Sequence, residues 1–148
     1  MTGRVARAAA LATLVVASAC SEATSGPLRI VWGRDACDHC GMAINEQAFA
    51  AEVRIGPREV MRFDDFGCAV AWLESRGGPA AASEFWVMDQ GRAEWIDARK
   101  AFYQPDQRTP MAYGFAAIRD EAPGSVEFER ARRTILERTR DRSADQHP

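Results

Sequence analysis

The chain has 148 residues, of which 47% are hydrophobic and 27% charged, enough for one small domain with an apolar core. Its 19 basic and 21 acidic side chains give a formal net charge of −2. This balance lacks the basic excess of a nucleic-acid-binding protein and excludes nucleic acid as the main partner.

The first 19 residues have the layout of a secretory signal peptide. Arg4 and Arg7 precede an apolar run over 8–19, which is shorter than the roughly 20 residues of a membrane span. The small residues Ala17-Ser18-Ala19 before Cys20 are similar to a bacterial lipobox, although Ala17 stands where leucine is usual. We predict a signal peptide over 1–19 and a lipidated Cys20. The alternatives are simple cleavage after Ala19, which leaves a free thiol, and a short membrane anchor.

Residues 20–27 are small and polar, as expected of a lipidated tether. The mature protein is then anchored to a membrane by acyl chains in the bacterial cell envelope, facing the oxidising periplasm. Loss of Arg4 and Arg7 leaves 17 basic and 21 acidic residues, a formal charge of −4.

The first structural segment, residues 48–76, predicts a β-hairpin followed by a helix. AEVRI and REVMRF have strand character and flank a Gly-Pro turn. Asp64 or Asp65 can cap the helix, whose apolar face is formed by residues at helical spacing: Phe66, Ala69, Val70 and Leu73. Gly77-Gly78-Pro79 ends the helix.

The middle of the chain, residues 84–110, predicts a strand at FWVMD and a turn at Asp89-Gln90-Gly91. A short strand or helix leads from there to the aromatic pair Phe102-Tyr103. Residues 104–110 contain two prolines and are expected to form a loop.

The last segment, residues 113–140, again predicts two strands and a helix. GFAAI is a strand, DEAPG a turn and SVEF a second strand or helix start. A helix follows, with its apolar side formed by Phe128, Ala131, Ile135 and Leu136. The polar tail over 141–148 is expected to fray.

Both segments therefore predict a hairpin followed by a helix, and the fold class is α+β. Two similar ββα-type halves, about 28–80 and 81–140, form one compact unit over 28–140. Gly41-Met42 precedes the first hairpin and Pro110-Met111 the second. An internal duplication would place Met42 and Met111 in equivalent loops.

The stretch CDHCGM, residues 37–42, holds the main candidates for chemistry. The pair Cys37 and Cys40 has the CxxC spacing of a redox dithiol, which would need a helix start to lower a thiol pKa. A structural zinc site would need two more ligands, and the other histidine, His147, lies at the chain end. Cys68 sits beside a helical apolar face and is interpreted as a buried, inert thiol.

Cu(I) needs fewer ligands and prefers thiolate and thioether sulfur. Met61 and Met88 lie in strand-like runs and are assigned to the core, whereas Met42 and Met111 lie in loops. A low-coordinate sulfur site built from Cys40, Met42 and Met111 would favour Cu(I) over Zn(II) and Mg(II).

These residues resemble the NosL family, lipoproteins that serve as copper chaperones for nitrous oxide reductase. The resemblance spans roughly 28–137. It rests on the order of several short motifs: Ala17-Ser18-Ala19-Cys20, Cys-Gly-Met at 40–42, FDD with a following cysteine at 63–68, WVMD at 86–89, Trp95-Ile96-Asp97-Ala98, and TPMAYGFAA at 109–117.

The resemblance implies a periplasm-facing lipoprotein that binds Cu(I) and delivers it for maturation of the copper centres of nitrous oxide reductase. It also implies a small fold of two similar ββα-type halves. Carried over by position, the copper ligands are Cys40, Met42 and Met111. Cys37 departs from the common family pattern and could ligate copper or form a disulfide with Cys40. Asp35 and His39 are lower-ranked candidates, with solvated loop positions as the alternative.

No serine-histidine-acid set or phosphate-binding loop is evident, and Asp64-Asp65 fits a helix cap, so we predict no enzyme activity. The main rival hypothesis is a periplasmic thiol-disulfide oxidoreductase that uses Cys37 and Cys40. A third hypothesis is a structural lipoprotein in which these cysteines form a plain disulfide. The oligomeric state is left open by the sequence.

Overall fold

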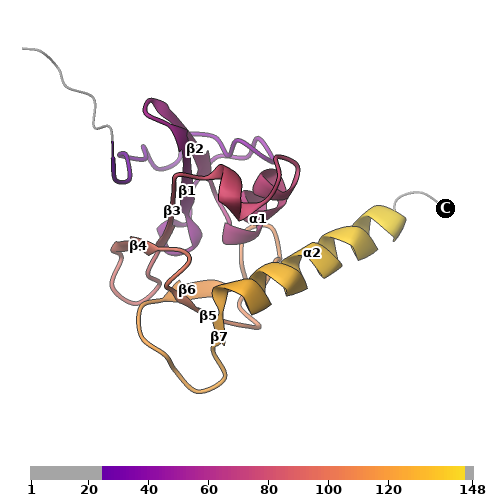
Figure 1. Ribbon diagram of the computed structural model, residues 1–148. Helices are drawn as coiled ribbons and strands as arrows, with labels where there is room; N and C mark the ends of the chain where they lie inside the picture. Colours follow the sequence, from indigo (N-terminus) through magenta and orange to yellow (C-terminus); the bar gives the residue numbers. More distant parts are fainter. Residues whose placement is uncertain (1–24, 146–148) are drawn as a thin grey trace, which may run out of the picture.

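Two antiparallel sheets and two α-helices make up the described part of the chain, residues 25–145 of the computed structural model (Figure 1). The first sheet has the order β2-β1-β3-β4, with β1 at Ala51–Gly56, β2 at Glu59–Phe63, β3 at Glu84–Met88 and β4 at Trp95–Asp97. The second has the order β6-β5-β7, with β5 at Phe102–Gln104, β6 at Ala116–Ile118 and β7 at Val126–Glu127. The helices are α1 at Phe66–Glu74 and α2 at Phe128–Asp145, and the short 3-10 helices are η1 at Gln47–Phe49 and η2 at Pro79–Ala81. The predicted α+β class is confirmed.

The first half follows the sequence prediction closely. β1 and β2 form an antiparallel hairpin in which Val53 lies opposite Met61. On its other side β1 pairs with β3, where Val53 lies opposite Phe85, so β1 is central and its core-facing side chains are buried. α1 begins after its N-cap residue Asp65 and buries the predicted apolar face. Gly77 follows the helix with a positive φ of 95°, which favours glycine.

The second half differs from the predicted hairpin. β6 and β7 do not pair with each other; both pair with β5, through Tyr103 opposite Ala117 and Tyr103 opposite Val126. The order strand, strand, helix is correct, but the prediction of a hairpin between 114–118 and 125–128 is wrong. The short strand at the aromatic pair Phe102-Tyr103 is the shared central partner.

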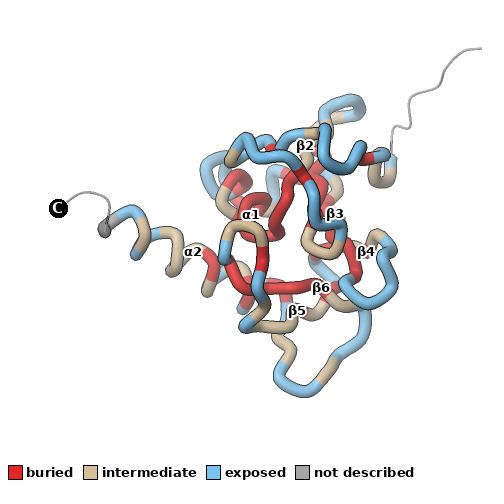
Figure 2. The backbone as a smooth tube through the Cα atoms, turned by 180° about the vertical axis from the view of Figure 1, so that it is seen from behind, coloured by how far each residue is buried: buried red, intermediate tan, exposed pale blue. Residues whose placement is uncertain are grey.

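Helix α2 extends further than predicted, to Asp145, so the first part of the expected frayed tail is helical. Its buried side chains, Phe128, Ala131 and Ile135, lie in its first half, and the later turns project away from the body of the protein (Figure 2). Within residues 25–145, no helix combines the length and apolar character needed to cross a membrane. The predicted signal peptide and Cys20 lie outside the described residues, as does His147.

The two halves share one aromatic core. The rings of Phe66 on α1 and Tyr103 on β5 stack with centroids 4.3 Å apart. Phe85 on β3 meets Phe128 on α2 edge to face at 5.9 Å. The hydroxyl of Tyr103 is satisfied inside the core, because it donates to the carbonyl of Ala98 at 2.7 Å. Each element that carries site residues is therefore fixed against the same core.

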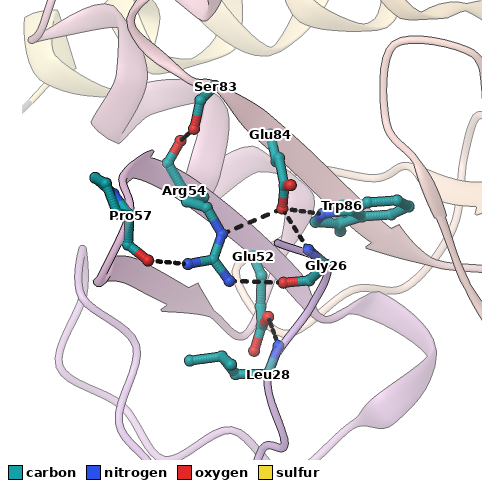
Figure 3. A network of polar contacts seen from close by, with 8 residues as sticks. All are labelled: Gly26, Leu28, Glu52, Arg54, Pro57, Ser83, Glu84 and Trp86. Carbon is teal, nitrogen blue, oxygen red and sulfur yellow. Dashed lines mark hydrogen bonds and ion pairs between the residues drawn. The ribbon is translucent and has the colours of Figure 1, made fainter. Parts of the chain in front are cut away.

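The N-terminal part of the described chain is held to the first sheet by buried charges (Figure 3). Arg54 on β1 is 3% exposed and forms an ion pair with Glu84 at 3.2 Å. It also donates to the carbonyls of Gly26 and Pro57 at 2.8 and 2.9 Å. Glu52, fully buried on the same strand, accepts the amide of Leu28 at 2.7 Å. The end of the predicted tether, at Gly26, and the residue Leu28 just after it are thus fastened directly to the sheet.

Replacing Arg54 with alanine is expected to lower the free energy of unfolding by about 3 kcal/mol, because two carbonyls and the Glu84 carboxylate lose their buried donor. Urea unfolding of the reduced chain measures this. Arg58→Ala is the matched control, because Arg58 is exposed in the hairpin turn, and its change should stay within about 0.5 kcal/mol. Equal midpoints for the two variants would contradict the stabilising role of Arg54.

Candidate metal centre

The CDHCGM stretch forms a closed turn. Ala36 and Ala43 form an isolated antiparallel bridge at its base. Inside it, the amide of Cys37 donates to the carbonyl of Met42 at 2.8 Å, and the amide of Gly41 donates to the carbonyl of Cys37 at 2.9 Å. Gly41 has a φ of 76°, so the turn needs a residue that tolerates the left-handed region. The CxxC motif therefore lies in a turn and not at a helix start.

This turn is attached to the end of β2 by a reciprocal contact. The amide of Asp38 donates to the carbonyl of Arg62 at 2.8 Å, and the amide of Arg62 donates to the Asp38 carboxylate at 2.6 Å. The Arg62 guanidinium also lies 3.9 Å from the carboxylate of Asp35. These contacts bring the CxxC turn to Asp64, where β2 leads into α1.

The loop that carries Met111 is attached to the start of α1 by Asp65. This buried carboxylate accepts the Thr109 hydroxyl at 2.6 Å, the Met111 amide at 3.1 Å and the Gly67 amide at 2.8 Å. Gly67 packs so closely on the ring of Tyr113 that a β-carbon there would overlap it. Because Asp65 both caps the helix and binds the loop, the two halves meet at this point.

Four ligand-bearing side chains converge beside this junction: Cys37, Cys40, Asp64 and Cys68. Their sulfur and carboxylate oxygen atoms all lie within 4.8 Å of one another. The Cys40 thiol is 3.5 Å from Oδ2 and 3.6 Å from Oδ1 of Asp64. Cys37, Asp64 and Cys68 are buried and Cys40 is half-buried, so the cluster reaches solvent through Cys40. The three described cysteines are free thiols.

The cluster contains some of the residues proposed from the sequence. Cys37 and Cys40 belong to it, whereas Asp35 and His39 lie outside the four-residue group. Asp35 instead accepts the amide of Val31 and faces Arg62. Met42 is 51% exposed, and Met111 is partly buried against the core. The ligand roles of the two methionines stay predictions.

Sequence analysis missed two members of the cluster. Cys68 is buried, as expected, but it faces two other thiols and is not isolated. Asp64 was considered only as a helix cap, whereas Asp65 is the cap and Asp64 faces Cys40. The sequence did contain a signal for both residues. Only one of two adjacent aspartates can serve as the N-cap, so the other was free for another role, and Cys68 follows at the third helical position.

Within the cluster the three thiols are electrostatically unequal. A hydrogen bond from the Cys68 thiol, with further help from the backbone amides of Cys40, Asp64 and His39, lowers the pKa of Cys37 to about 6. Burial raises the pKa of Cys40 to about 11. The hydrogen bond to Cys37 and burial raise the pKa of Cys68 well above its usual range. One buried thiolate, on Cys37, is therefore expected near neutral pH in the reduced protein.

A small α+β fold that gathers three thiols and a carboxylate at the junction of two halves defines a protein with a thiol-rich candidate metal centre. Its structure is similar to the crystal structure of the copper chaperone NosL from Shewanella denitrificans, with a TM-score of 0.54 over 75% of this chain and 87% of that chain. The two sequences are 17% identical over this match, so the likeness concerns the fold. It confirms the fold expected from the NosL resemblance. No protein-family model and no curated protein sequence matches the chain.

Titration of the reduced, metal-free protein is expected to show a thiolate step near pH 6 in ultraviolet absorbance. Because the lowered pKa favours the charged form, absorbance should rise as pH increases through about 6. Cys37→Ser should remove the step, and Cys68→Ala should move it to higher pH by removing the thiol donor. A wild-type protein with no thiolate change between about pH 5 and 8 would contradict the assignment.

Proposed function

We propose that this protein is a lipid-anchored Cu(I) chaperone of the bacterial cell envelope, which delivers copper for assembly of the copper centres of nitrous oxide reductase. The observation that carries the copper part is the convergence of Cys37, Cys40 and Cys68 within 4.8 Å, because closely spaced thiolates are preferred Cu(I) ligands. The similarity in fold to a copper chaperone supports the same class of function.

The delivery site is proposed at the solvent-facing edge of the cluster, with Cys40, Met42 and Met111 as ligands. Cys40 is the half-buried thiol, and the exposed Met42 follows it by two residues. Met111 comes from the loop held by Asp65, whose neighbour Asp64 touches Cys40. The adjacent aspartates thus hold the two predicted sulfur loops to one short segment, which supports a shared site.

Copper transfer from such an edge would proceed by ligand exchange. Sulfur from an acceptor binds the exposed side of the Cu(I) ion while the chaperone ligands leave one at a time. The thioether of Met42 would be replaced first, because Met42 is 51% exposed and an acceptor can reach it, whereas Cys40 and Met111 are partly buried. This mechanism needs no general base and no covalent intermediate.

The membrane anchor and the client are supported by sequence features. Cys20 with its small preceding residues supports lipidation, and the stretch from 20 to 27 supports a tether. The end of this stretch is fastened to the first sheet at Gly26 by Arg54, so the domain would be held a short distance from the membrane. Nitrous oxide reductase and its maturation machinery are proposed as partners from the NosL resemblance.

A second candidate function is thiol-disulfide exchange by Cys37 and Cys40. The lowered pKa of Cys37 favours it, since the thiolate is the nucleophile. The arrangement opposes it, however, because Cys37 is only 2% exposed while the accessible Cys40 has a raised pKa. The motif also lies in a turn, without a helix start to stabilise an exposed thiolate.

Anaerobic titration of the reduced full-length chain with Cu(I), against a chromogenic chelator, tests the delivery site. Met42→Leu and Met111→Leu remove a thioether with little change in volume, and each is expected to weaken Cu(I) binding by about tenfold or more. Met61→Leu is the matched control, because Met61 lies in β2 and should leave the affinity unchanged.

If the wild-type chain does not compete with the chelator for Cu(I), the copper proposal is wrong. Equal affinities for all three leucine variants would restrict copper to the cysteines and exclude the methionine ligands.

A disulfide-exchange assay separates the two candidate functions. The reduced wild-type chain is expected to react with a small model disulfide no faster than Cys37→Ser, because the reactive thiolate is buried. Cys37→Ser should still bind Cu(I) through the remaining sulfur ligands, though more weakly. Rapid exchange by the wild type that disappears in Cys37→Ser, together with unchanged copper affinity, would favour the oxidoreductase.

A further inference from the structure

The turn over residues 31–34, called here the apolar turn, carries two exposed side chains that the metal centre does not use. In the part of the chain that the structure describes, the exposed large hydrophobic residues are Val31, Trp32 and Met42. Met42 belongs to the proposed delivery site, whereas the adjacent Val31 and Trp32 are 41% and 38% exposed. We propose that the apolar turn docks the protein on an anionic phospholipid bilayer. This inference rests on the lipid anchor of the proposed function and adds the face that contacts the membrane.

The apolar turn is held in a fixed shape by its backbone. The carbonyl of Val31 accepts the amides of Arg34 at 3.0 Å and Asp35 at 2.9 Å. The amide of Val31 donates to the Asp35 carboxylate at 2.9 Å. Gly33, with a φ of 75°, donates to the carbonyl of Ile44 at 2.8 Å and so ties the turn to the next segment. Because the exposed side chains stand on an ordered backbone, little conformational entropy is lost when they bind a surface.

A hollow beside the apolar turn widens the apolar surface. It has a volume of about 430 Å³. Its larger apolar lining residues are Leu28, Ile30, Val31, Trp32, Met88 and Trp95. Arg29 is the only charged residue among the described residues that line it, and Arg34 is exposed in the turn itself. Aromatic rings favour the membrane–water interface, and arginine favours anionic headgroups, so this composition fits the surface of an anionic bilayer.

The chain enters the domain next to this hollow. Gly26 is fixed on both sides, because its amide donates to Glu84 at 2.8 Å and its carbonyl accepts from Arg54 at 2.8 Å. Cys20, the predicted lipidation site, precedes Gly26 by six residues, which span at most about 20 Å. The hollow begins at Leu28, two residues after Gly26. A bilayer that holds the acyl chains is therefore within reach of the apolar turn.

The anchor makes a small contact surface effective. Two apolar side chains and two arginines would hold a free protein only weakly, but a short tether turns the contact into an intramolecular step at millimolar effective concentration. The described chain begins on the side of the molecule opposite the far end of α2, so the tether enters away from the projecting turns of that helix (Figures 1 and 2). The anchor also keeps a bilayer beside the turn at all times, which favours lipid over a protein partner as its occupant.

Quenching of tryptophan fluorescence by brominated acyl chains tests the contact, because bromine quenches only at short range. The lipidated full-length protein is reconstituted in vesicles of phosphatidylethanolamine and phosphatidylglycerol, with and without brominated chains. The wild type is expected to be quenched, and Trp32→Tyr should lose about half of the quenching or more. Trp72→Phe is the matched control and should keep it, because Trp72 is buried on α1. No quenching of the wild type, or equal quenching of Trp32→Tyr, would overturn the docking face.

Headgroup charge gives a second test, which leaves the apolar side chains intact. Replacing phosphatidylglycerol with phosphatidylcholine should reduce the quenching, and Arg29→Glu should reduce it in the anionic vesicles. Arg140→Glu, on the outer part of α2, is the control and should have no effect. Equal quenching by neutral and anionic vesicles would overturn the assignment to an anionic surface.

A photoreactive benzoylphenylalanine in place of Trp32 identifies the occupant directly. In the reconstituted vesicles and in the cell envelope, its main adduct is expected to be phospholipid. A main adduct with a second copy of the chain, or with another protein, would overturn the bilayer as the occupant.

The intact mass of the purified protein separates this inference from the proposed anchor, because it shows whether Cys20 carries lipid. A lipidated protein without quenching that depends on Trp32 would overturn the docking face and leave the anchor in place. A protein without lipid would contradict the anchor. Quenching of that unlipidated chain through Trp32 would still support the docking face, and its absence would overturn both. Trp32→Tyr should keep the wild-type Cu(I) affinity, so the result is independent of the copper site.

Discussion

The site depends on the burial of two adjacent carboxylates, Asp64 and Asp65, where β2 leads into α1. Asp65 caps the helix and holds the loop of the second half through Thr109 and Met111. Because the cap fixes the backbone at this point, Asp64 is directed toward the CxxC turn, where it meets Cys40. Burial raises the pKa of Asp65, so the interaction is maintained against a desolvation cost by its three donors. The same pair of adjacent aspartates therefore joins the two halves and takes part in the thiol cluster.

The rest of the fold supplies the rigidity that this arrangement requires. Phe66, the first residue of α1, stacks on Tyr103 of the second sheet, so the helix start cannot move without disturbing the shared core. The CxxC turn is attached to β2 at Arg62, just two residues before Asp64. Thiols that would repel one another as thiolates are thus brought together by packing and backbone hydrogen bonds. Such preorganisation is what a metal site gains from being placed on a hairpin and a helix.

Local patterns predicted the first half well, because its contacts are close in sequence. The alternation in REVMRF and the helical spacing of Phe66, Ala69, Val70 and Leu73 each specify one buried face. The second half was harder, because β6 and β7 are very short strands whose partner, β5, lies outside the segment that suggested a hairpin. Periodicity identifies a strand but not its partner. The same limit applies to Cys68, which reaches Cys37 and Cys40 only through tertiary packing, so a single cysteine on an apolar helix face was assigned to the core.

Exposure and ligand hardness change together across the site. Cys68 and Asp64 are buried, Cys40 is half-buried, and Met42 is 51% exposed. The carboxylate thus lies on the inner side and a soft thioether on the outer side, with one thiol between them. A Cu(I) ion bound at the edge, as proposed, would be held partly by this exposed thioether, which an acceptor can reach. Because Cys40 lies between the buried and the exposed ligand-bearing side chains, it is the thiol through which the cluster reaches solvent.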